Sequence, residues 1–305
     1  MVGETDTLSN AIAAFPAAGR RALIAAVAPQ SFAGCLAARD AALIARTSGM
    51  LPDGLLLALV PLATAYARPA ISEFYVGAVA RGRSGALYLG ANLEFPGTSL
   101  WTSLHAEQSA VARAWAHGET SIEALAVSAP PCGLCRQFLA ELGPGEALAI
   151  VTPQGRATLA ELLPRAFGPA SLGRTAGLLD APRRPLELAH PNSDPLVAAA
   201  LDAARASYAP YTAAPAGVAL RLRSGAIVSA PYAESAAHNP SMAPLAAALS
   251  QRVFAGLEGD EIMAAVLVAV GHGMIDHGGA ARTLLTAVAP GVRLLLWPAR
   301  FGDEG

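Results

Sequence analysis

An internal repeat is the feature of the sequence that most constrains the fold. Self-similarity at a fixed spacing indicates a duplicated structural unit. Adding 140 to the residue number aligns Gly77 with Gly217, Glu94 with Glu234, residues 122–128 with 262–268, and Cys132-Gly133 with His272-Gly273. A chance alignment of two Ala-rich segments is the alternative, and it explains fewer of these matches. We therefore expect two related domains.

Each copy mixes segments typical of strands with segments typical of helices. In the first copy we expect strands at 75–81, 86–90 and 124–128 and helices at 103–117 and 134–142. This mixture predicts a layered α/β fold. We expect an N-terminal helical segment over 1–48, a first α/β domain over 49–168, a linker rich in Pro, Gly and Arg over 169–194, and a second α/β domain over 195–305.

Charge and hydropathy exclude several function classes. All 21 basic residues are Arg, so no Lys is present to form a Schiff base or to bind phosphate in a phosphate-binding loop. The formal net charge is −2 and the Arg residues are scattered, which predicts a small-molecule substrate and no nucleic-acid partner. The longest apolar run, 55–67, is interrupted by Pro61, and the N-terminus lacks the features of a secretory signal. We therefore expect a cytoplasmic protein with no membrane partner.

The residues with metal-binding chemistry form two short motifs. These are His105-Ala106-Glu107 and Pro131-Cys132-Gly133-Leu134-Cys135. One imidazole and two thiolates give zinc three protein ligands and leave the fourth position for water, which is typical of a catalytic site. The sequence therefore predicts one Zn²⁺ per chain, with His105, Cys132 and Cys135 as its ligands.

Each of these residues also has a simpler interpretation when it is taken alone. His105 fits a helix cap or a core position, Glu107 fits an acid in the first turn of a helix, and the Cys pair fits a redox site. A redox pair does not explain the His-x-Glu upstream, so the combination favours the metal. Glu107 lies two residues from a ligand and is the candidate proton carrier of the reaction.

The spacing His-x-Glu followed by Pro-Cys-x-x-Cys is recognised as the signature of zinc deaminases. Nearly the whole chain resembles the cytidine deaminase family, in particular its two-domain, homodimeric bacterial members. The motifs that carry this resemblance lie at 72–78 (SEFYVGA), 90–95 (GANLEF), 105–110 (HAEQSA), 131–138 (PCGLCRQF), 166–169 (AFGP) and 232–234 (YAE). The resemblance implies a three-layer α/β/α domain with a mixed sheet, duplicated, after an N-terminal helical segment.

The resemblance also implies a reaction, namely hydrolysis of cytidine and 2′-deoxycytidine to the uracil nucleosides and ammonia in pyrimidine salvage. Zinc would supply the hydroxide, and Glu107 would move protons to ring nitrogen N3 and to the leaving amino group. The implied substrate contacts are Asn92 and Glu94 on the ribose, Phe74 on the pyrimidine ring, and Ala106. Core packing and a turn are the alternative roles of Phe74 and Asn92. If Asn92 and Glu94 bind the sugar, free cytosine should be a poor substrate.

Other residues have expected roles around the metal and the interface. Arg136 and Gln137 follow a ligand and would orient the ligands, although a surface role for Arg136 is the alternative. A homodimer would place the active site near its interface, with Phe167 reaching the partner. Pro130 replaces the Ser or Thr usual in the family, which removes a hydroxyl and keeps the backbone carbonyl.

The second copy is expected to lack a metal site. The offset of 140 aligns the zinc ligands and Glu107 with residues that cannot hold zinc: Leu245, Ala247, His272 and Ile275. His272, Asp276 and His277 form a polar cluster, but a polar loop is the commoner arrangement. We expect this domain to serve as a scaffold.

Three alternative functions remain at this point. The first is deamination of a base within DNA or RNA, which would need a basic or aromatic channel. The second is deamination of another aminopyrimidine nucleoside. The third is a non-catalytic zinc protein that binds nucleosides, which would need a fourth protein ligand, and Cys35 is the only spare thiol.

Overall fold

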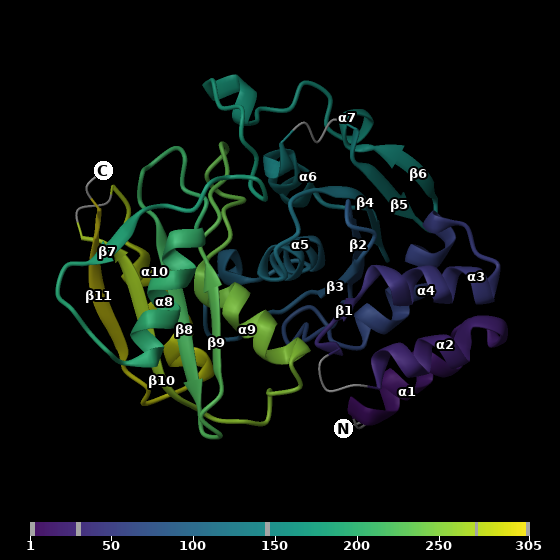
Figure 1. Cartoon of the computed structure of the whole chain (residues 1–305), viewed down its shortest axis with the longest axis horizontal. Helices are drawn as coiled ribbons and strands as arrows, with labels where there is room; N and C mark the ends of the chain where they lie inside the picture. Colours follow the sequence, from purple (N-terminus) through teal and green to yellow (C-terminus); the bar gives the residue numbers. More distant parts are fainter. Residues whose placement is uncertain (1–3, 29–31, 144–146, 272–273, 303–305) are drawn as a thin grey trace. The chain divides into compact units, whose positions relative to one another are not determined.

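A computed structural model describes residues 4–28, 32–143, 147–271 and 274–302 (Figure 1). The chain divides into two compact units. Unit 1 comprises Met1–Leu93 and His105–Ala166, and unit 2 comprises Glu94–Leu104 and Phe167–Gly305. The boundaries expected from the sequence for domains and linker stay predictions.

Unit 1 is built on a mixed sheet. Its helices are α1 (Glu4–Ala14), α2 (Ala17–Val27), α3 (Ala38–Ser48), α4 (Pro52–Thr64), α5 (Ala106–Ala116), α6 (Gly133–Leu139) and α7 (Leu159–Leu162), with a 3-10 turn at Ala140–Leu142. Its strands are β1 (Cys35–Leu36), β2 (Gly77–Gly82), β3 (Leu87–Ala91), β4 (Ile122–Val127), β5 (Ala149–Thr152) and β6 (Gly155–Thr158). They pair in the order β1-β3-β2-β4-β5-β6, with β4 and β5 parallel and the other pairs antiparallel.

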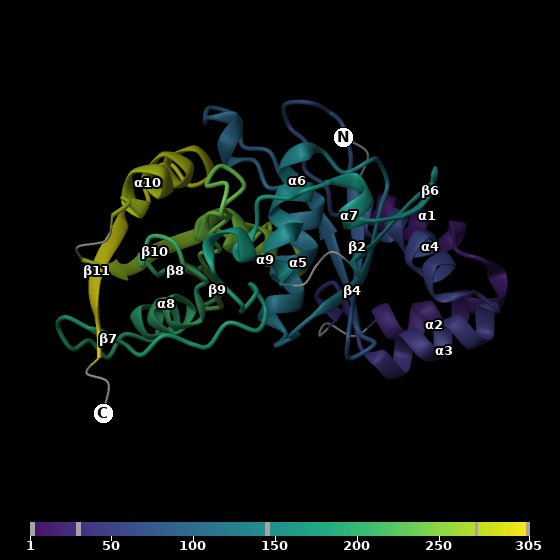
Figure 2. The same cartoon turned by 90° about the horizontal axis from the view of Figure 1, so that it is seen from above.

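Helices cover both faces of this sheet. A Cβ at Gly77 would lie 2.5 Å from the Thr64 backbone N of α4, and a Cβ at Gly90 would lie 2.2 Å from the Ala106 carbonyl O of α5. Gly90 pairs with Ala78, the neighbour of Gly77, so the two helices lie on opposite faces (Figure 2). With both faces covered, the central strands are almost wholly apolar and buried.

Unit 2 contains a second mixed sheet. Its helices are α8 (Pro195–Ala206), α9 (Pro244–Phe254) and α10 (His277–Val288), with 3-10 turns at Leu100–Thr102 and Pro169–Leu172. Its strands are β7 (Leu186–Leu188), β8 (Ala216–Leu222), β9 (Ile227–Pro231), β10 (Ile262–Val270) and β11 (Leu294–Phe301), in the order β7-β11-β10-β8-β9. Only β10 and β11 are parallel within this sheet. Helices α8 and α10 lie on its opposite sides (Figure 2).

The structure confirms the α/β fold with a mixed sheet in two copies. The register Gly77↔Ala91 between β2 and β3 recurs as Gly217↔Pro231 between β8 and β9, at the predicted offset of 140. The register Ala78↔Val127 between β2 and β4 likewise recurs as Val218↔Leu267 between β8 and β10.

The ungapped alignment is wrong at the two helices that correspond to the metal-binding helices. Helices α5 and α9 both have 11 residues, but α9 begins 138 positions after α5 because its connection to the preceding strand is two residues shorter. Ala243 and Leu245, and not Leu245 and Ala247, therefore correspond to His105 and Glu107.

The second correction concerns the helix after the central strand. Strand β10 has nine residues whereas β4 has six, and the residue before α10 is Asp276, where Cys132 stands before α6. Asp276 and Gly279 therefore correspond to Cys132 and Cys135. His272 lies outside the described residues.

Two further differences from the sequence expectation concern unit 1. The N-terminal segment contains a short strand, β1, in which Cys35 pairs with Tyr88. Strand β2 begins two residues after the predicted position 75, because side-chain hydrogen bonds hold the residues before Gly77.

Among the described residues, no single helix is long and apolar enough to span a membrane. The bent pair α3 and α4 meets the length and composition test only when the two helices are taken together.

Candidate metal centre

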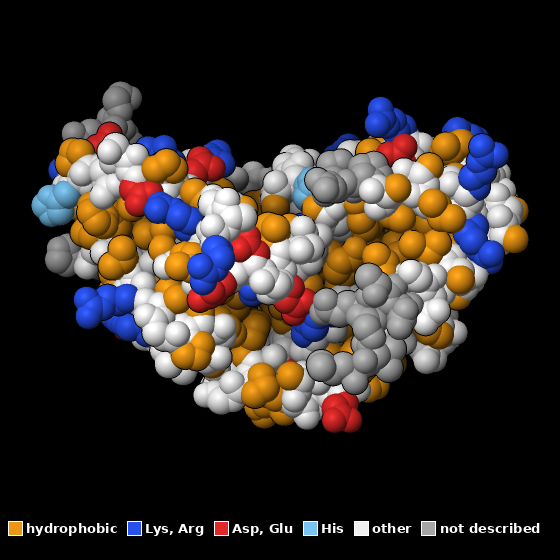
Figure 3. Space-filling model, turned by 90° about the horizontal axis from the view of Figure 1, so that it is seen from below, with side chains coloured by type: hydrophobic (Ala, Val, Ile, Leu, Met, Phe, Trp, Pro, Cys, Tyr) orange, Lys and Arg blue, Asp and Glu red, His pale blue; other side chains and the backbone are white. Residues whose placement is uncertain are grey.

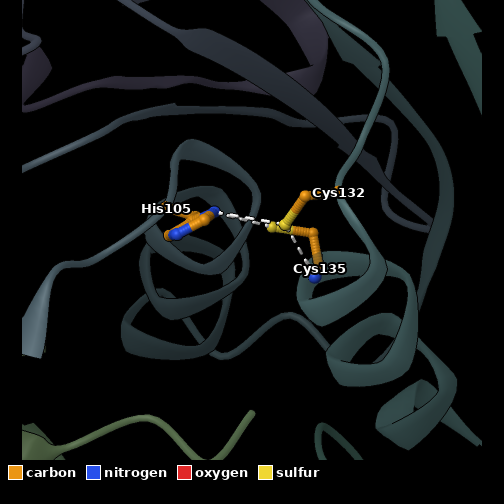
Figure 4. Close-up of side chains that lie close together, drawn as sticks. All are labelled: His105, Cys132 and Cys135. Carbon is orange, nitrogen blue, oxygen red and sulfur yellow. Dashed lines mark hydrogen bonds between the residues drawn. The ribbon is translucent and has the colours of Figure 1, made fainter. Parts of the chain in front are cut away.

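Two helix starts bring the predicted zinc ligands together. His105 is the residue immediately before α5, and Cys132 occupies the same position before α6, with Cys135 in the first turn of α6. Figure 4 shows the three side chains pointing toward one another. The backbone N of Cys135 donates to Cys132 Sγ at 3.5 Å, and the backbone N of His105 donates to Gln108 Oε1 at 3.3 Å. Each helix start therefore fixes one ligand by a local hydrogen bond.

The distances among the ligand atoms fit a zinc ion. His105 Nδ1 lies 3.5 Å from Cys132 Sγ and 3.2 Å from Cys135 Sγ, and all three ligand atoms lie within 4.8 Å of one another. Tetrahedral zinc with ordinary Zn–S and Zn–N bonds places such atoms about 3.6 Å apart. One nitrogen and two sulfurs are also the donor set that zinc prefers.

The thiols at this centre have strongly shifted pKa values. A hydrogen bond from Cys135, together with one from His105, lowers the pKa of Cys132 to about 3, while sharing a proton with Cys132 and burial raise the pKa of Cys135. Cys132 is exposed, and Cys135 is buried. A thiolate next to a helix N-terminus is the state that binds metal.

Glu107 lies in the first turn of α5 with only 4% of its surface exposed. Burial raises the pKa of its carboxyl group, although hydrogen bonds to its own backbone N–H and to the Cys135 thiol oppose this effect. The raised pKa means that this carboxyl group holds a proton more readily than a free carboxyl group does, which suits a proton carrier.

Arg136 holds the segment that carries Cys132. Its Nε donates to the Pro131 carbonyl at 2.8 Å and its Nη1 donates to the Leu162 carbonyl at 2.8 Å. The guanidinium thus links the residue before a ligand to α7. Arg136 is half-buried, and its role toward the ligands stays a prediction.

Cys35 is not part of the ligand cluster. It lies in β1 opposite Tyr88, and the cluster found among the described residues consists of His105, Cys132 and Cys135. This arrangement leaves the fourth position of a tetrahedral metal to a non-protein ligand, as a catalytic site requires.

The predicted substrate contacts have different environments. Asn92 is 8% exposed and its amide binds the backbone of residues 74–76, whereas the Phe74 side chain is 61% exposed. Ala106 is buried at the start of α5. Glu94 and Phe167 belong to unit 2, and their roles toward the site stay predictions.

Two residues that support the centre were not singled out from the sequence. Gly90 allows the α5 backbone to lie against β3, because a Cβ there would be 2.2 Å from both Ala106 O and Ala110 N. Ser109 Oγ accepts from Ala91 N at 3.2 Å and joins the same helix to the same strand. Gly90 lies in a predicted strand, where an isolated Gly is a signal of close backbone approach.

Comparison with known proteins matches both halves of the chain to family models of the same description. A family model described as "Cytidine and deoxycytidylate deaminase zinc-binding region" matches residues 53–151, and a second model of that description matches residues 159–282. Among similar proteins, the cytidine deaminase of Shewanella loihica is 47% identical over 261 residues, which cover 85% of this chain and 88% of that protein. The cytidine deaminase of Shewanella oneidensis is 48% identical with the same coverage.

A solved structure is also similar to part of the chain. The cytidine deaminase of Mycobacterium leprae is 34% identical, and the match covers 38% of this chain and 100% of that chain with a TM-score of 0.36.

Proposed function

Because the chain belongs to the cytidine and deoxycytidylate deaminase family, we propose that it hydrolyses cytidine and 2′-deoxycytidine to uridine, 2′-deoxyuridine and ammonia. The observation that carries this proposal is the cluster of His105, Cys132 and Cys135 beside the buried carboxyl group of Glu107. These three side chains would hold Zn²⁺. When bound, zinc lowers the pKa of a coordinated water and so makes a nucleophile available at neutral pH.

Glu107 performs the proton transfers in this proposal. It takes a proton from the attacking water and delivers it to N3, which makes C4 of the cytosine ring electrophilic. It then delivers the second water proton to the amino group, which leaves C4 as ammonia. Its burial supports this role, because burial raises the pKa of the carboxyl group and makes it a better proton acceptor.

Arg136 and Gln137 are proposed to support the ligands. The two hydrogen bonds of Arg136 hold the backbone immediately before Cys132, so this residue acts on the position of the ligand through the loop. Pro130 begins the same loop and restricts it further, since its ring fixes one backbone torsion.

Asn92, Glu94, Phe74 and Ala106 are proposed to bind the nucleoside. An amide and a carboxylate suit sugar hydroxyls, which both donate and accept, and an aromatic ring suits a flat base. Binding of the sugar would help to position C4, so cytosine without its sugar is expected to be a poor substrate.

A free nucleoside fits the surface better than a nucleic acid does. On the face drawn in Figure 3, the described Arg side chains lie in separate places among acidic and hydrophobic side chains, and these described residues form no continuous basic stripe. We further propose a cytoplasmic homodimer in pyrimidine salvage, with the active site near the interface and Phe167 reaching the partner subunit.

The decisive experiment measures ammonia release and the loss of cytosine absorbance. Zinc-loaded protein is given cytidine, 2′-deoxycytidine, cytosine or a single-stranded oligonucleotide, with Glu107→Ala and zinc-stripped protein as controls. We expect rapid turnover of the two nucleosides alone, abolished in both controls. Inactivity on the nucleosides would overturn the proposal, and activity on the oligonucleotide would identify a nucleic-acid deaminase.

A further inference from the structure

The segment that carries Phe74 is held by few contacts of its own. Residues 73–76 lie outside helices and strands, and the Phe74 side chain is 61% exposed. Glu73 adopts a φ of +55°, a left-handed conformation that is unfavourable for a residue with a side chain. Such a conformation persists only where the surroundings fix it. The position of the Phe74 ring therefore depends on how its backbone is anchored.

Two polar side chains anchor this backbone. Asn92 Nδ2 donates to the Phe74 carbonyl at 2.9 Å, and the Val76 backbone N donates to Asn92 Oδ1 at 2.9 Å. Because a carbonyl only accepts and a backbone N–H only donates, this pair of partners fixes the orientation of the amide. The Phe74 backbone N donates to Ser72 Oγ at 3.1 Å. Both polar backbone groups of Phe74 are thus bound by side chains.

In unit 2, the segment that corresponds to residues 73–76 has the same backbone arrangement, but a different type of side chain binds it. The offset of 140 relates Asn92 to Tyr232 and Phe74 to Ala214. The bond from Asn92 N to Val76 O, 3.2 Å, recurs from Tyr232 N to Ala216 O at 2.9 Å, and the left-handed residue recurs at Ala213 with a φ of +50°. A Tyr side chain has no amide, and there His277 Nε2 donates to the Ala214 carbonyl at 2.8 Å.

The repeat therefore identifies a structural requirement. In both units a side-chain donor binds the carbonyl of the residue that follows the left-handed one. Unit 1 meets this requirement with Asn92, which follows β3 and is expected to contact the substrate, whereas unit 2 meets it with His277, the first residue of α10.

We infer that Asn92 is a positioning residue for the aromatic platform: its amide holds the backbone of residues 74–76 and so fixes the Phe74 ring where the pyrimidine binds. The inference rests on the proposed function and adds to it a role of Asn92 that does not involve the sugar. Ser72 acts in the same way on the other side of Phe74.

Hydrogen exchange measures the anchoring directly. In zinc-loaded Asn92→Ala protein, backbone exchange within residues 73–77 should accelerate about fivefold, as expected for the loss of one ordinary hydrogen bond per anchored amide. Asn192→Ala is a matched control, because Asn192 Oδ1 also accepts a backbone bond, from Asp194 N, but in unit 2. Unchanged exchange in Asn92→Ala would overturn the inference.

Turnover of 2′,3′-dideoxycytidine separates positioning from sugar binding. This nucleoside lacks the 2′- and 3′-hydroxyls of the sugar, so a residue that only binds those two groups cannot affect its turnover. We expect Asn92→Ala to lower kcat/KM for both cytidine and 2′,3′-dideoxycytidine about 25-fold, the effect of two lost ordinary hydrogen bonds. An effect on cytidine alone would overturn the inference.

Two further variants make the test independent of folding defects. Ser72→Ala alters an exposed side chain and should accelerate exchange at Phe74 while lowering kcat/KM about threefold, the effect of one weak hydrogen bond. Phe74→Ala should lower kcat/KM by a smaller factor in Asn92→Ala protein than in the natural protein, because Asn92 acts through the position of Phe74. Additive losses would contradict the inference, whereas a natural protein inactive on cytidine would contradict the proposed function instead.

Discussion

The metal centre of unit 1 and the corresponding place in unit 2 are built on the same arrangement of helix starts, but none of the three ligand residues of unit 1 recurs in unit 2. His105 and Cys132, the residues before α5 and α6, correspond to Ala243 and Asp276, the residues before α9 and α10. Cys132 Sγ accepts a bond from Cys135 N, and the Asp276 carboxylate accepts bonds from Gly278 N at 2.7 Å and Gly279 N at 3.1 Å. The residue immediately before the helix is therefore a predicted metal ligand in unit 1 and a helix-capping residue in unit 2.

In unit 2, a small cavity lies at the starts of α9 and α10. It has a volume of 160 Å³, and the residues that line it include Tyr232, Ser241, Ala243, Leu245, Asp276 and His277. Asp276 and His277 here bind the protein itself, Asp276 as the cap of α10 and His277 through the Ala214 carbonyl. The comparison teaches that the same helix starts and sheet register are kept where the residues that correspond to the ligands are Ala243, Asp276 and Gly279.

The largest expected difference between the two places is catalytic. Glu107→Gln should lower kcat for cytidine by about 10³-fold or more, because an amide cannot carry the protons. Its zinc content should stay unchanged. Glu261→Gln, the same change at an exposed carboxylate of unit 2, is the control and should retain activity. A Glu107→Gln enzyme with a tenth of the natural activity would contradict the role of Glu107.

Metal content tests the comparison next. We expect one zinc per chain in the natural protein, loss of most zinc in Cys132→Ser, and unchanged zinc in Asp276→Asn, which retains a capping oxygen. Atomic spectroscopy on dialysed protein measures all three. Two zinc ions per chain would show that unit 2 has kept a metal site.

Close packing of the first paired strand on its helix should be equally important in both units. A Cβ at Gly77 would lie 2.7 Å from Val60 O, and a Cβ at Gly217 would lie 2.5 Å from Ala200 O. Gly77→Ala and Gly217→Ala should each lower the free energy of unfolding by about 1–3 kcal/mol, the usual cost of overpacking. Gly54→Ala, with open space around its Cβ, is the control in urea unfolding. Loss in only one unit would show that the copies have diverged in their packing.

The smallest expected effect is the pH dependence of unit 2. Burial lowers the pKa of His277 below its ordinary value, so its neutral form is favoured in the folded state. The stability that it contributes is present above the pKa of the unfolded state, about 6.5, and is lost as pH falls through the lower folded value. His277→Gln should therefore show a smaller fall in Tm between pH 8 and pH 5.5. An equal fall in both proteins would assign the acid sensitivity to other groups.

The sequence by itself determined the chemistry and the duplication. His105, Cys132 and Cys135 were identifiable because metal binding depends on residue types at a short spacing, and the structure places their ligand atoms together. The repeat was identifiable because paired strands tolerate few insertions, since a slip of one residue turns every side chain to the other face. The offset of 140 accordingly holds for the pairs among β2, β3 and β4, which recur among β8, β9 and β10. It fails at the next strand, because Leu125 pairs with Ile150 whereas Ala265 pairs with Leu294.

Only the tertiary structure decided where that alignment fails and what the polar side chains bind. The loop before α9 is shorter and β10 is longer, so Asp276 and not His272 corresponds to Cys132, and loop length has no periodic signal in the sequence. The sequence around Asn92 is the same whether its amide binds a sugar or the backbone of residues 74–76, so the sequence does not reveal its partner. Its hydrogen bonds join residues that are distant in the chain, and their geometry exists only once β2 and β3 have paired.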